Sequence, residues 1–341
     1  MSGRLAWGGA TLGGAALLVW LAVAPPDVHP SSGLEVVATG VPRPLQLVLD
    51  GRALVILSPG SHGDSAGEIY RLDLGGEFPV DLSRQPRVRI PYADWRTATL
   101  GSLALDPVSR QLFLGEENGS RIYRLSADER LTVYATGLHR LPGGSTLAFD
   151  GLGRLLIVDY VDLTLSPGEE RGPPGLEQLR GEDYRGPLVF RLGLDPDIPL
   201  PRRLDRVAPL FPRAWGGRQG GALLPRLISV AALATGDLAL LSSTGEVYRL
   251  ASDGAFSLLA RLPPGHGQYN RTHMVPASDG SVFVSGGFQV GRIFRVSPSG
   301  LVTTIASNLA DPEGIALDAS GHLYVAESSF HRIVRLKLTA P

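Results

Sequence analysis

Short runs of alternating apolar and polar residues fill the chain, and one four-residue pattern recurs six times among them. Each copy has an aliphatic residue, an aromatic or branched residue, an arginine and another aliphatic residue, which is a composition typical of a β-strand. The arginines are 40 to 67 residues apart, a spacing typical of the blades of a β-propeller. The six copies are Ile69–Leu72, Ile122–Leu125, Val189–Leu192, Val247–Leu250, Ile293–Val296 and Ile333–Leu336.

A second pattern precedes most of these tetrads. An apolar strand ends near an aspartate, a turn that often contains glycine follows, and another apolar strand comes next. These two strands and the tetrad predict strands a, b and c of a blade. The clearest examples are 103–106 before 112–114, 147–150 before 155–158 and 315–318 before 323–325.

The order of the fourth strands predicts how the ring closes. Strand d follows the tetrad at 131–137 and at 302–307, but the last tetrad has no such strand after Leu338. A matching strand stands instead near the start of the chain, at 34–40. An N-terminal strand that completes the last blade would close the ring and cover its edges. The sequence therefore predicts an all-β, six-bladed propeller over 34–341, closed by the N-terminal strand.

The third blade leaves an alternative open, because 160–187 is long enough to hold further strands and a seventh blade. This stretch is poor in apolar residues and contains the run Gly168–Gly175, which is rich in Glu, Pro and Gly. We expect a loop inserted between strands b and c.

The N-terminal residues predict a membrane segment. The 20 residues after Arg4 carry no charge, and a helix of 20 residues is long enough to span a bilayer. Ala22 to Ala24 resemble a signal-peptidase site, but Pro25 would follow the cut, which disfavours cleavage. We predict a signal anchor, or alternatively a signal peptide, at 1–25 and a linker at 26–33. The protein is then membrane-anchored and extracytoplasmic, or secreted if the segment is cleaved.

Charge and composition exclude several functions. The charges of the 32 basic and 33 acidic residues nearly cancel, so we expect no nucleic-acid partner. We expect contact with the membrane through the N-terminal segment only. The chain has no cysteine, which excludes disulfides, thiol nucleophiles and thiolate metal sites. Motifs for a serine nucleophile, for Walker-type phosphate binding and for dinucleotide binding are missing from the sequence.

Residues 312–327, together with 332–336, resemble an NHL repeat and the repeat of the senescence-marker-protein/gluconolactonase family. The resemblance implies a six-bladed propeller, a fold that serves lactonases, lyases, sugar dehydrogenases and binding proteins. It also implies that Glu313 stands where gluconolactonase-like proteins carry an acidic metal ligand. Those proteins have asparagines at other strand starts, where this sequence has Ser145, Ile228 and Thr272.

In a propeller, the starts of strands a and the ends of strands b meet on one face around the central channel. We therefore predict a site among the polar residues at these places, on a face that also carries enlarged loops near 58–67, 160–187 and 209–226. The channel-face candidates are Glu313, His273, Glu116, Asp159 and Glu327.

Glu313, Asp159 and Glu116 are the predicted ligands of a divalent metal such as calcium, and His273 would shift the preference toward zinc or manganese. The structural interpretation is that the acids bind turn amides or arginines and that His273 binds backbone. A polar loop beside it, which includes Arg271, is either a binding rim or a solvated turn. The tetrad arginines are expected to pair with acids of adjacent strands.

The incomplete catalytic patterns favour a binding module that takes a small-molecule, carbohydrate or protein ligand at the channel face. Two enzymes remain as alternatives. One is a metal-dependent hydrolase of the lactonase type. The other is a quinone-dependent sugar dehydrogenase with a histidine base.

Overall fold

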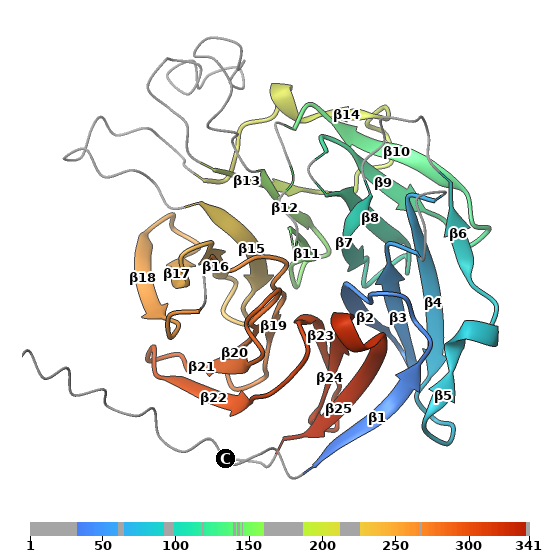
Figure 1. Ribbon diagram of the computed structural model, residues 1–341. Helices are drawn as coiled ribbons and strands as arrows, with labels where there is room; N and C mark the ends of the chain where they lie inside the picture. Colours follow the sequence, from blue (N-terminus) through green and yellow to red (C-terminus); the bar gives the residue numbers. More distant parts are fainter. Residues whose placement is uncertain are drawn as a thin grey trace, which may run out of the picture.

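Six sheets surround a common axis in the computed structural model of the chain (Figure 1). The structure describes residues 33–60, 65–91, 99–117, 119–138, 141, 144, 146–159, 187–211, 226–265 and 268–338. Every tetrad lies in the third strand of its sheet, counted from the axis. The all-β, six-bladed propeller is thus confirmed.

The blades follow one another along the chain. Blade 1 contains β2 (Gln46–Asp50), β3 (Ala53–Ser58), β4 (Gly67–Asp73) and β6 (Val88–Ile90). Blade 2 contains β7 (Leu100–Leu105), β8 (Leu112–Glu116), β9 (Ile122–Leu125) and β10 (Leu131–Thr136). Blade 3 contains β11 (Leu147–Phe149), β12 (Leu155–Asp159) and β13 (Leu188–Leu192).

The second half of the ring repeats this order. Blade 4 contains β15 (Leu227–Ala232), β16 (Leu238–Ser242), β17 (Glu246–Leu250) and β18 (Phe256–Arg261). Blade 5 contains β19 (Met274–Pro276), β20 (Val282–Ser285), β21 (Ile293–Val296) and β22 (Val302–Ala306). Blade 6 contains β23 (Pro312–Leu317), β24 (His322–Glu327), β25 (Arg332–Lys337) and β1 (Leu34–Thr39).

The N-terminal strand closes the ring as predicted. β1 pairs antiparallel with β25, with Leu34 opposite Leu336 and Thr39 opposite Arg332. Val37 and Ala38 of β1 are fully buried, and they pack in one cluster with Ile333. The last blade therefore takes its outer strand from the other end of the chain.

Blade 3 has a reduced outer edge. Its sheet contains three strands among the described residues, and beyond them Phe211 forms an isolated bridge with Val189. β12 and β13 pair with each other although residues 160–187 separate them, so the insertion lies between strands b and c, as expected. Residues 160–186 themselves lie outside the described part of the chain.

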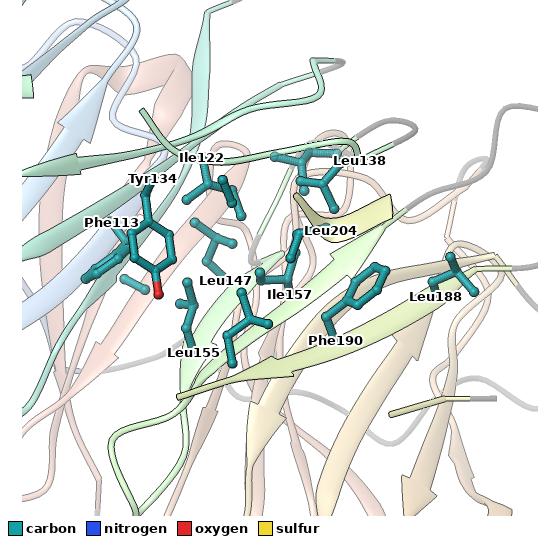
Figure 2. Close-up of a cluster of buried hydrophobic side chains, with 14 residues drawn as sticks. Phe113, Ile122, Tyr134, Leu138, Leu147, Leu155, Ile157, Leu188, Phe190 and Leu204 are labelled. Carbon is teal, nitrogen blue, oxygen red and sulfur yellow. The ribbon is translucent and has the colours of Figure 1, made fainter. Parts of the chain in front are cut away.

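The hydrophobic core lies between neighbouring blades. Figure 2 shows one such cluster, in which Phe113 and Tyr134 of blade 2 face Ile157 and Phe190 of blade 3. The rings of Phe113 and Tyr134 meet edge to face, with centroids 4.8 Å apart. Alternate residues of each strand point into the space between sheets, which explains why the short apolar runs specify the fold.

Two short segments fasten the outer strand of one blade to the next blade, and we call 78–84 and 200–206 the latches. Each lies after the third strand of its own blade, in blades 1 and 3. The first contains β5 (Val80–Asp81), parallel to β1, and η1 (Leu82–Arg84). The second contains β14 (Arg202–Arg203), parallel to β10, and η3 (Leu204–Arg206).

Each latch inserts one leucine into an interblade core. Leu82 is 1% exposed, in the cluster of β1, and Leu204 is fully buried, in the cluster of Figure 2. A glycine after the gripped strand makes room for each latch. A Cβ atom on Gly40 would lie 2.6 Å from an Asp81 carboxylate oxygen, and one on Gly137 would lie 2.5 Å from an Asp205 carboxylate oxygen.

Replacing Gly137 by alanine is expected to loosen the second latch. The φ of Gly137 is +81°, which costs a residue with a Cβ about 1–2 kcal/mol. The close approach of Asp205 adds about 1–3 kcal/mol of overpacking. Gly236→Ala is the matched control, because its φ is +85° but no atom lies within 4 Å of the added Cβ. Urea unfolding should show the larger loss for Gly137→Ala, and equal losses would contradict the role of the latch.

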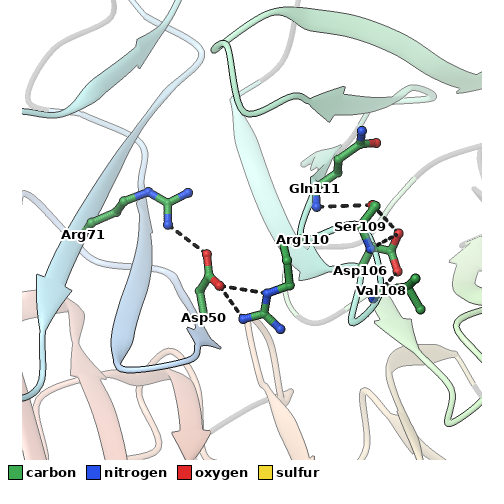
Figure 3. Close-up of polar contacts among 7 residues, drawn as sticks. All are labelled: Asp50, Arg71, Asp106, Val108, Ser109, Arg110 and Gln111. Carbon is green, nitrogen blue, oxygen red and sulfur yellow. Dashed lines mark hydrogen bonds and ion pairs between the residues drawn. The ribbon is translucent and has the colours of Figure 1, made fainter.

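Five of the six tetrad arginines pair with acids, as predicted, and most of these acids lie at or near the turn between the first and second strands of the blade. Figure 3 shows Asp50 between Arg71 of its own blade and Arg110 of blade 2, with a distance of 3.0 Å from Arg71 Nη1 to Asp50 Oδ2. Other tetrads repeat this arrangement; the pairs are Arg191–Asp150, Arg249–Asp237, Arg295–Asp279 and Arg335–Glu35. These ion pairs belong to the scaffold.

The predicted signal anchor at 1–25 and nearly all of the linker at 26–33 lie outside the described residues. No helix in the described part of the chain is long and apolar enough to span a bilayer. The anchor therefore remains a prediction.

Candidate functional site

The starts of the innermost strands converge around the axis. In blades 2 and 3, the Ser102 hydroxyl donates to the Gly144 carbonyl oxygen at 2.8 Å and also contacts the Thr146 hydroxyl. Gly144 in turn forms a bridge with Thr272 of blade 5, although blades 3 and 5 are not neighbours. The channel is therefore narrow enough at this level for backbone to cross it.

Three charged residues from three blades meet at this face, and we call Glu117, Arg271 and Glu313 the channel cluster. Arg271 precedes β19 in blade 5, Glu117 follows β8 in blade 2, and Glu313 lies in β23 of blade 6. Arg271 Nε and Nη2 donate to the two Glu117 carboxylate oxygens, at 3.0 Å and 3.1 Å. Arg271 Nη1 lies 3.9 Å from Glu313 Oε1. Because blades 2 and 5 are opposite in the ring, the bidentate pair spans the channel.

Burial dominates the ionisation of the cluster. Glu313 is 1% exposed, and its desolvation raises its pKa to about 8, against the opposing effects of Arg271 and of a hydrogen bond with Ser328. Burial alone would lower the pKa of Arg271, but Glu117 and Glu313 outweigh it and raise that pKa. At neutral pH the cluster therefore contains one ion pair and one neutral carboxylic acid.

His273 binds backbone with one ring nitrogen. Its Nδ1 accepts the Ile315 amide hydrogen at 3.1 Å, which leaves the ring proton on Nε2. Burial lowers the pKa of His273 to about 3, so the ring is neutral at physiological pH. The backbone of the same residue donates to the Ser285 hydroxyl, which donates to the Glu313 carbonyl oxygen at 2.5 Å. His273 thus joins blades 5 and 6.

Glu116 and Glu327, two of the other predicted acids, have hydrogen-bond partners within or beside their own blades. Glu116 accepts from the Tyr123 hydroxyl at 2.6 Å and from the Ser120 amide at 3.2 Å. Glu327 accepts from Arg332 Nε at 2.5 Å and from the Ala310 amide at 2.9 Å. Asp159 is fully buried and has an interaction partner as well. These contacts match the structural interpretation of such residues, whereas Glu313 is the predicted acid that joins the channel cluster.

Four buried oxygen atoms at the starts of innermost strands have no hydrogen-bond partner among the residues that the structure describes. They belong to blades 1, 4, 5 and 6, and they are Gln46 Oε1, Ser229 Oγ, Thr272 Oγ1 and Glu313 Oε2. Buried polar atoms without a partner are uncommon and costly. All four lie at the level where the blades converge around the channel.

The positive group that faces the Glu313 carboxyl is Arg271, 3.9 Å from Nη1 to Oε1, and its charge opposes the binding of a cation there. Among the described residues, no group of three or more histidine, aspartate and glutamate side chains is placed to hold a metal ion. The metal role of Glu313, Asp159 and Glu116 stays a prediction.

Sequence reasoning missed Glu117. It selected Glu116, the last residue of β8, and the two adjacent glutamates look equivalent in the sequence. The structure distinguishes them, because the Tyr123 hydroxyl donates to the Glu116 carboxylate while Arg271 donates to the Glu117 carboxylate. The loop with Arg271 was expected to be a rim or a solvated turn, and its arginine is a member of the cluster. Ser145 and His266 lie outside the described residues, as do most of the residues in the enlarged loops.

Comparison with known proteins adds a family assignment for one blade. The model of the NHL repeat matches residues 309–336, which include β23, β24 and β25. This segment is an NHL repeat. No curated protein matches the sequence at a significant level. The resemblance of blade 6 to NHL repeats is thereby confirmed.

Solved structures match the whole propeller at low identity. Virginiamycin B lyase from Staphylococcus aureus is 11% identical, with a TM-score of 0.55 over 90% of this chain and 99% of that one. A protein assigned as a gluconolactonase is 14% identical, with a TM-score of 0.55 over 92% and 96% of the two chains. Aldose sugar dehydrogenase from Streptomyces coelicolor is 15% identical, with a TM-score of 0.51 over 90% and 99%. These likenesses establish the six-bladed fold.

Proposed function

We propose that the propeller is a ligand-binding module whose site is the channel face around the channel cluster. The observation that carries this proposal is the set of four unpartnered buried oxygens next to an ion pair that spans the channel. A small polar ligand would supply their hydrogen bonds. Carbohydrates and other small molecules have the necessary groups, and a protein partner could insert a polar side chain.

Thermal melting of the protein with panels of sugars, carboxylates, amines and divalent metals tests this proposal. A ligand that binds only the folded state raises the melting temperature. We expect at least one class to do so, and Ser229→Ala and Thr272→Val to reduce the effect. Neither change should destabilise the free protein by more than about 0.5 kcal/mol, since neither hydroxyl has a partner.

Ser285→Ala is the contrasting control, because the Ser285 hydroxyl holds His273 and Glu313. This change should cost the free protein about 1–3 kcal/mol. The proposal fails if no class of compound raises the melting temperature. It also fails if every such rise persists undiminished in both Ser229→Ala and Thr272→Val.

A metal-dependent hydrolase of the lactonase type is the second candidate. Glu313 favours it, because a buried acid with a pKa near 8 can deliver or take up a proton at neutral pH. In this candidate, calcium raises the melting temperature and the protein hydrolyses lactones. Glu313→Gln should abolish that turnover while the fold is kept. Turnover that survives in Glu313→Gln would remove Glu313 from the reaction.

The site works outside the cytoplasmic membrane in this proposal, held there by residues 1–25. The uncharged stretch after Arg4 supports an anchor, as argued from the sequence. The full chain should sediment with membranes, and a chain that begins at Gly33 should not. Equal distribution of the two chains between the fractions would contradict the anchor.

A further inference from the structure

Two exposed phenylalanines lie on neighbouring loops of the channel face, and we call Phe288 and Phe330 the phenylalanine pair. They are 44% and 59% exposed, in the connections between second and third strands of blades 5 and 6. Asp311 holds these two connections together. Its carboxylate accepts from the Gln289 amide at 2.7 Å and from the Ser329 hydroxyl, so the two loops form one rim.

The rim adjoins the channel cluster. The Phe288 amide donates to the Asn270 carbonyl oxygen at 3.0 Å, and the Gly287 amide donates to that of Pro312 at 2.9 Å. Asn270 and Pro312 directly precede Arg271 and Glu313 in the chain. Phe288 is therefore attached, through its backbone, to both sides of the cluster.

The exposure of these rings calls for an occupant. Fully burying a phenylalanine side chain contributes about 1.5–3 kcal/mol, and the folded protein forgoes part of this at both positions. Single exposed apolar residues are common, but two rings on one rim beside a buried polar cluster are typical of a ligand site. The guanidinium of Arg332 lies 4.8 Å from the centroid of the Phe330 ring, on one side of it, and the residue remains largely exposed.

Arg271 of the channel cluster, which follows Asn270 in the chain, adjoins this rim. Two nitrogens of Arg271 bind Glu117, but Nη1 is 3.9 Å from Glu313, which is too far for a hydrogen bond. The charge of Arg43 also lowers the pKa of Glu313, against the larger effect of burial. The Arg43 backbone amide donates to Nδ1 of His331, the neighbour of Phe330. A planar carboxylate is the group that a guanidinium binds best.

We propose that the site takes a small carboxylate that carries a flat apolar ring. The ring packs on the phenylalanine pair, and the carboxylate accepts hydrogen bonds from Arg271 beside Arg43. This assignment rests on the proposed function and specifies the chemistry of its ligand.

Calorimetric titration of the full chain with three probes tests the assignment. The probes are 3-phenylpropionate, propionate, which lacks the ring, and 3-phenylpropanol, which lacks the carboxylate. We expect 3-phenylpropionate to bind about ten-fold or more tightly than either of the others, since it alone makes both contacts. Equal affinity for the three probes, or no binding of 3-phenylpropionate, would overturn the assignment.

Variants locate the two contacts. Phe288→Ala and Phe330→Ala should each weaken 3-phenylpropionate about five-fold or more and leave propionate unchanged. Arg271→Gln should reduce 3-phenylpropionate to the affinity of 3-phenylpropanol. Leu301→Ala is the matched control, because Leu301 is 67% exposed in a turn between third and fourth strands. A loss in Leu301→Ala equal to that in both phenylalanine variants would show that the ring does not bind at the rim.

Failure of this assignment is distinguishable from failure of the proposed function. A neutral sugar such as methyl glucoside provides the comparison, because it can also pack on aromatic rings. If methyl glucoside binds in a manner that depends on Thr272 while 3-phenylpropionate does not bind, the channel face is a binding site but its ligand is not a carboxylate. If no compound of the broader panels binds, both proposals fail.

Discussion

A chain that begins at Val41 is expected not to form the closed propeller, whereas one that begins at Gly33 should form it. The shorter chain lacks β1, so β25 becomes an unpaired edge and the first latch loses the strand that it grips. It also loses Val37 and Ala38, both fully buried. Exposed sheet edges promote association between chains. Size-exclusion chromatography and thermal melting should therefore show aggregates, or a monomer without a cooperative transition.

Moving the strand tests whether its place in the ring matters more than its place in the sequence. Residues 34–39 can be joined behind Leu338 through a short flexible linker, in a chain that otherwise begins at Val41. This variant should regain a cooperative transition, because the strand again reaches β25. A chain that begins at Val41 and melts like the one from Gly33 would show that β1 does not close the ring.

The free energy of unfolding of the protein is expected to fall as the pH rises from about 4.5 to 8, and Glu313→Gln should remove most of this fall. Below pH 4.5, the acid is protonated in both the folded and the unfolded chain. Between 4.5 and 8, the unfolded chain loses the proton and the folded chain keeps it, so stability falls as the pH rises. The change is on the order of 5 kcal/mol, at about 1.36 kcal/mol for each pH unit. Urea unfolding at several pH values measures it.

His273 makes the stability depend on pH in the opposite direction and provides the internal control. Its pKa is about 3 in the folded protein and 6.5 in a model peptide, so stability falls as the pH drops from 6.5 to 3. His273→Asn should flatten this acidic limb and leave the alkaline loss in place. Glu313→Gln should do the reverse. An unchanged slope above pH 4.5 in Glu313→Gln would mean that the Glu313 carboxyl is not held neutral.

The sequence carried the fold because the fold is repetitive. Six similar tetrads and a spare outer strand at 34–40 specify the number of blades and the closure, since only a ring satisfies both. The latches were not foreseen, although both segments contain the pattern Pro-x-x-Leu-x-Arg, at 79–84 and 201–206, because three shared residues are too few to stand out in the sequence. Their role depends on contact with a strand of another blade, which no local pattern reveals.

The sequence predicted a site at the channel face, which stays a prediction, and it missed Glu117 of the channel cluster. Alignment of the blades selected Glu313 and His273, and the structure has both at the starts of innermost strands. It could not choose between Glu116 and Glu117, because that choice depends on which one Tyr123 occupies. Nor could it pair Arg271 with a glutamate 154 residues away across the axis.

The two latches add a second connection at two of the six interfaces between blades, and the pairs of blades that they connect contribute to the channel cluster. One latch ties blade 1 to blade 6, and the other ties blade 3 to blade 2. Blades 4 and 5 make the remaining pair, in which Gly300 lies against the Leu259 carbonyl oxygen. Each pair supplies one member of the cluster: Glu313, Glu117 and Arg271. The cluster therefore joins the three pairs of blades across the channel, and a molecule bound there would contact residues of all three pairs.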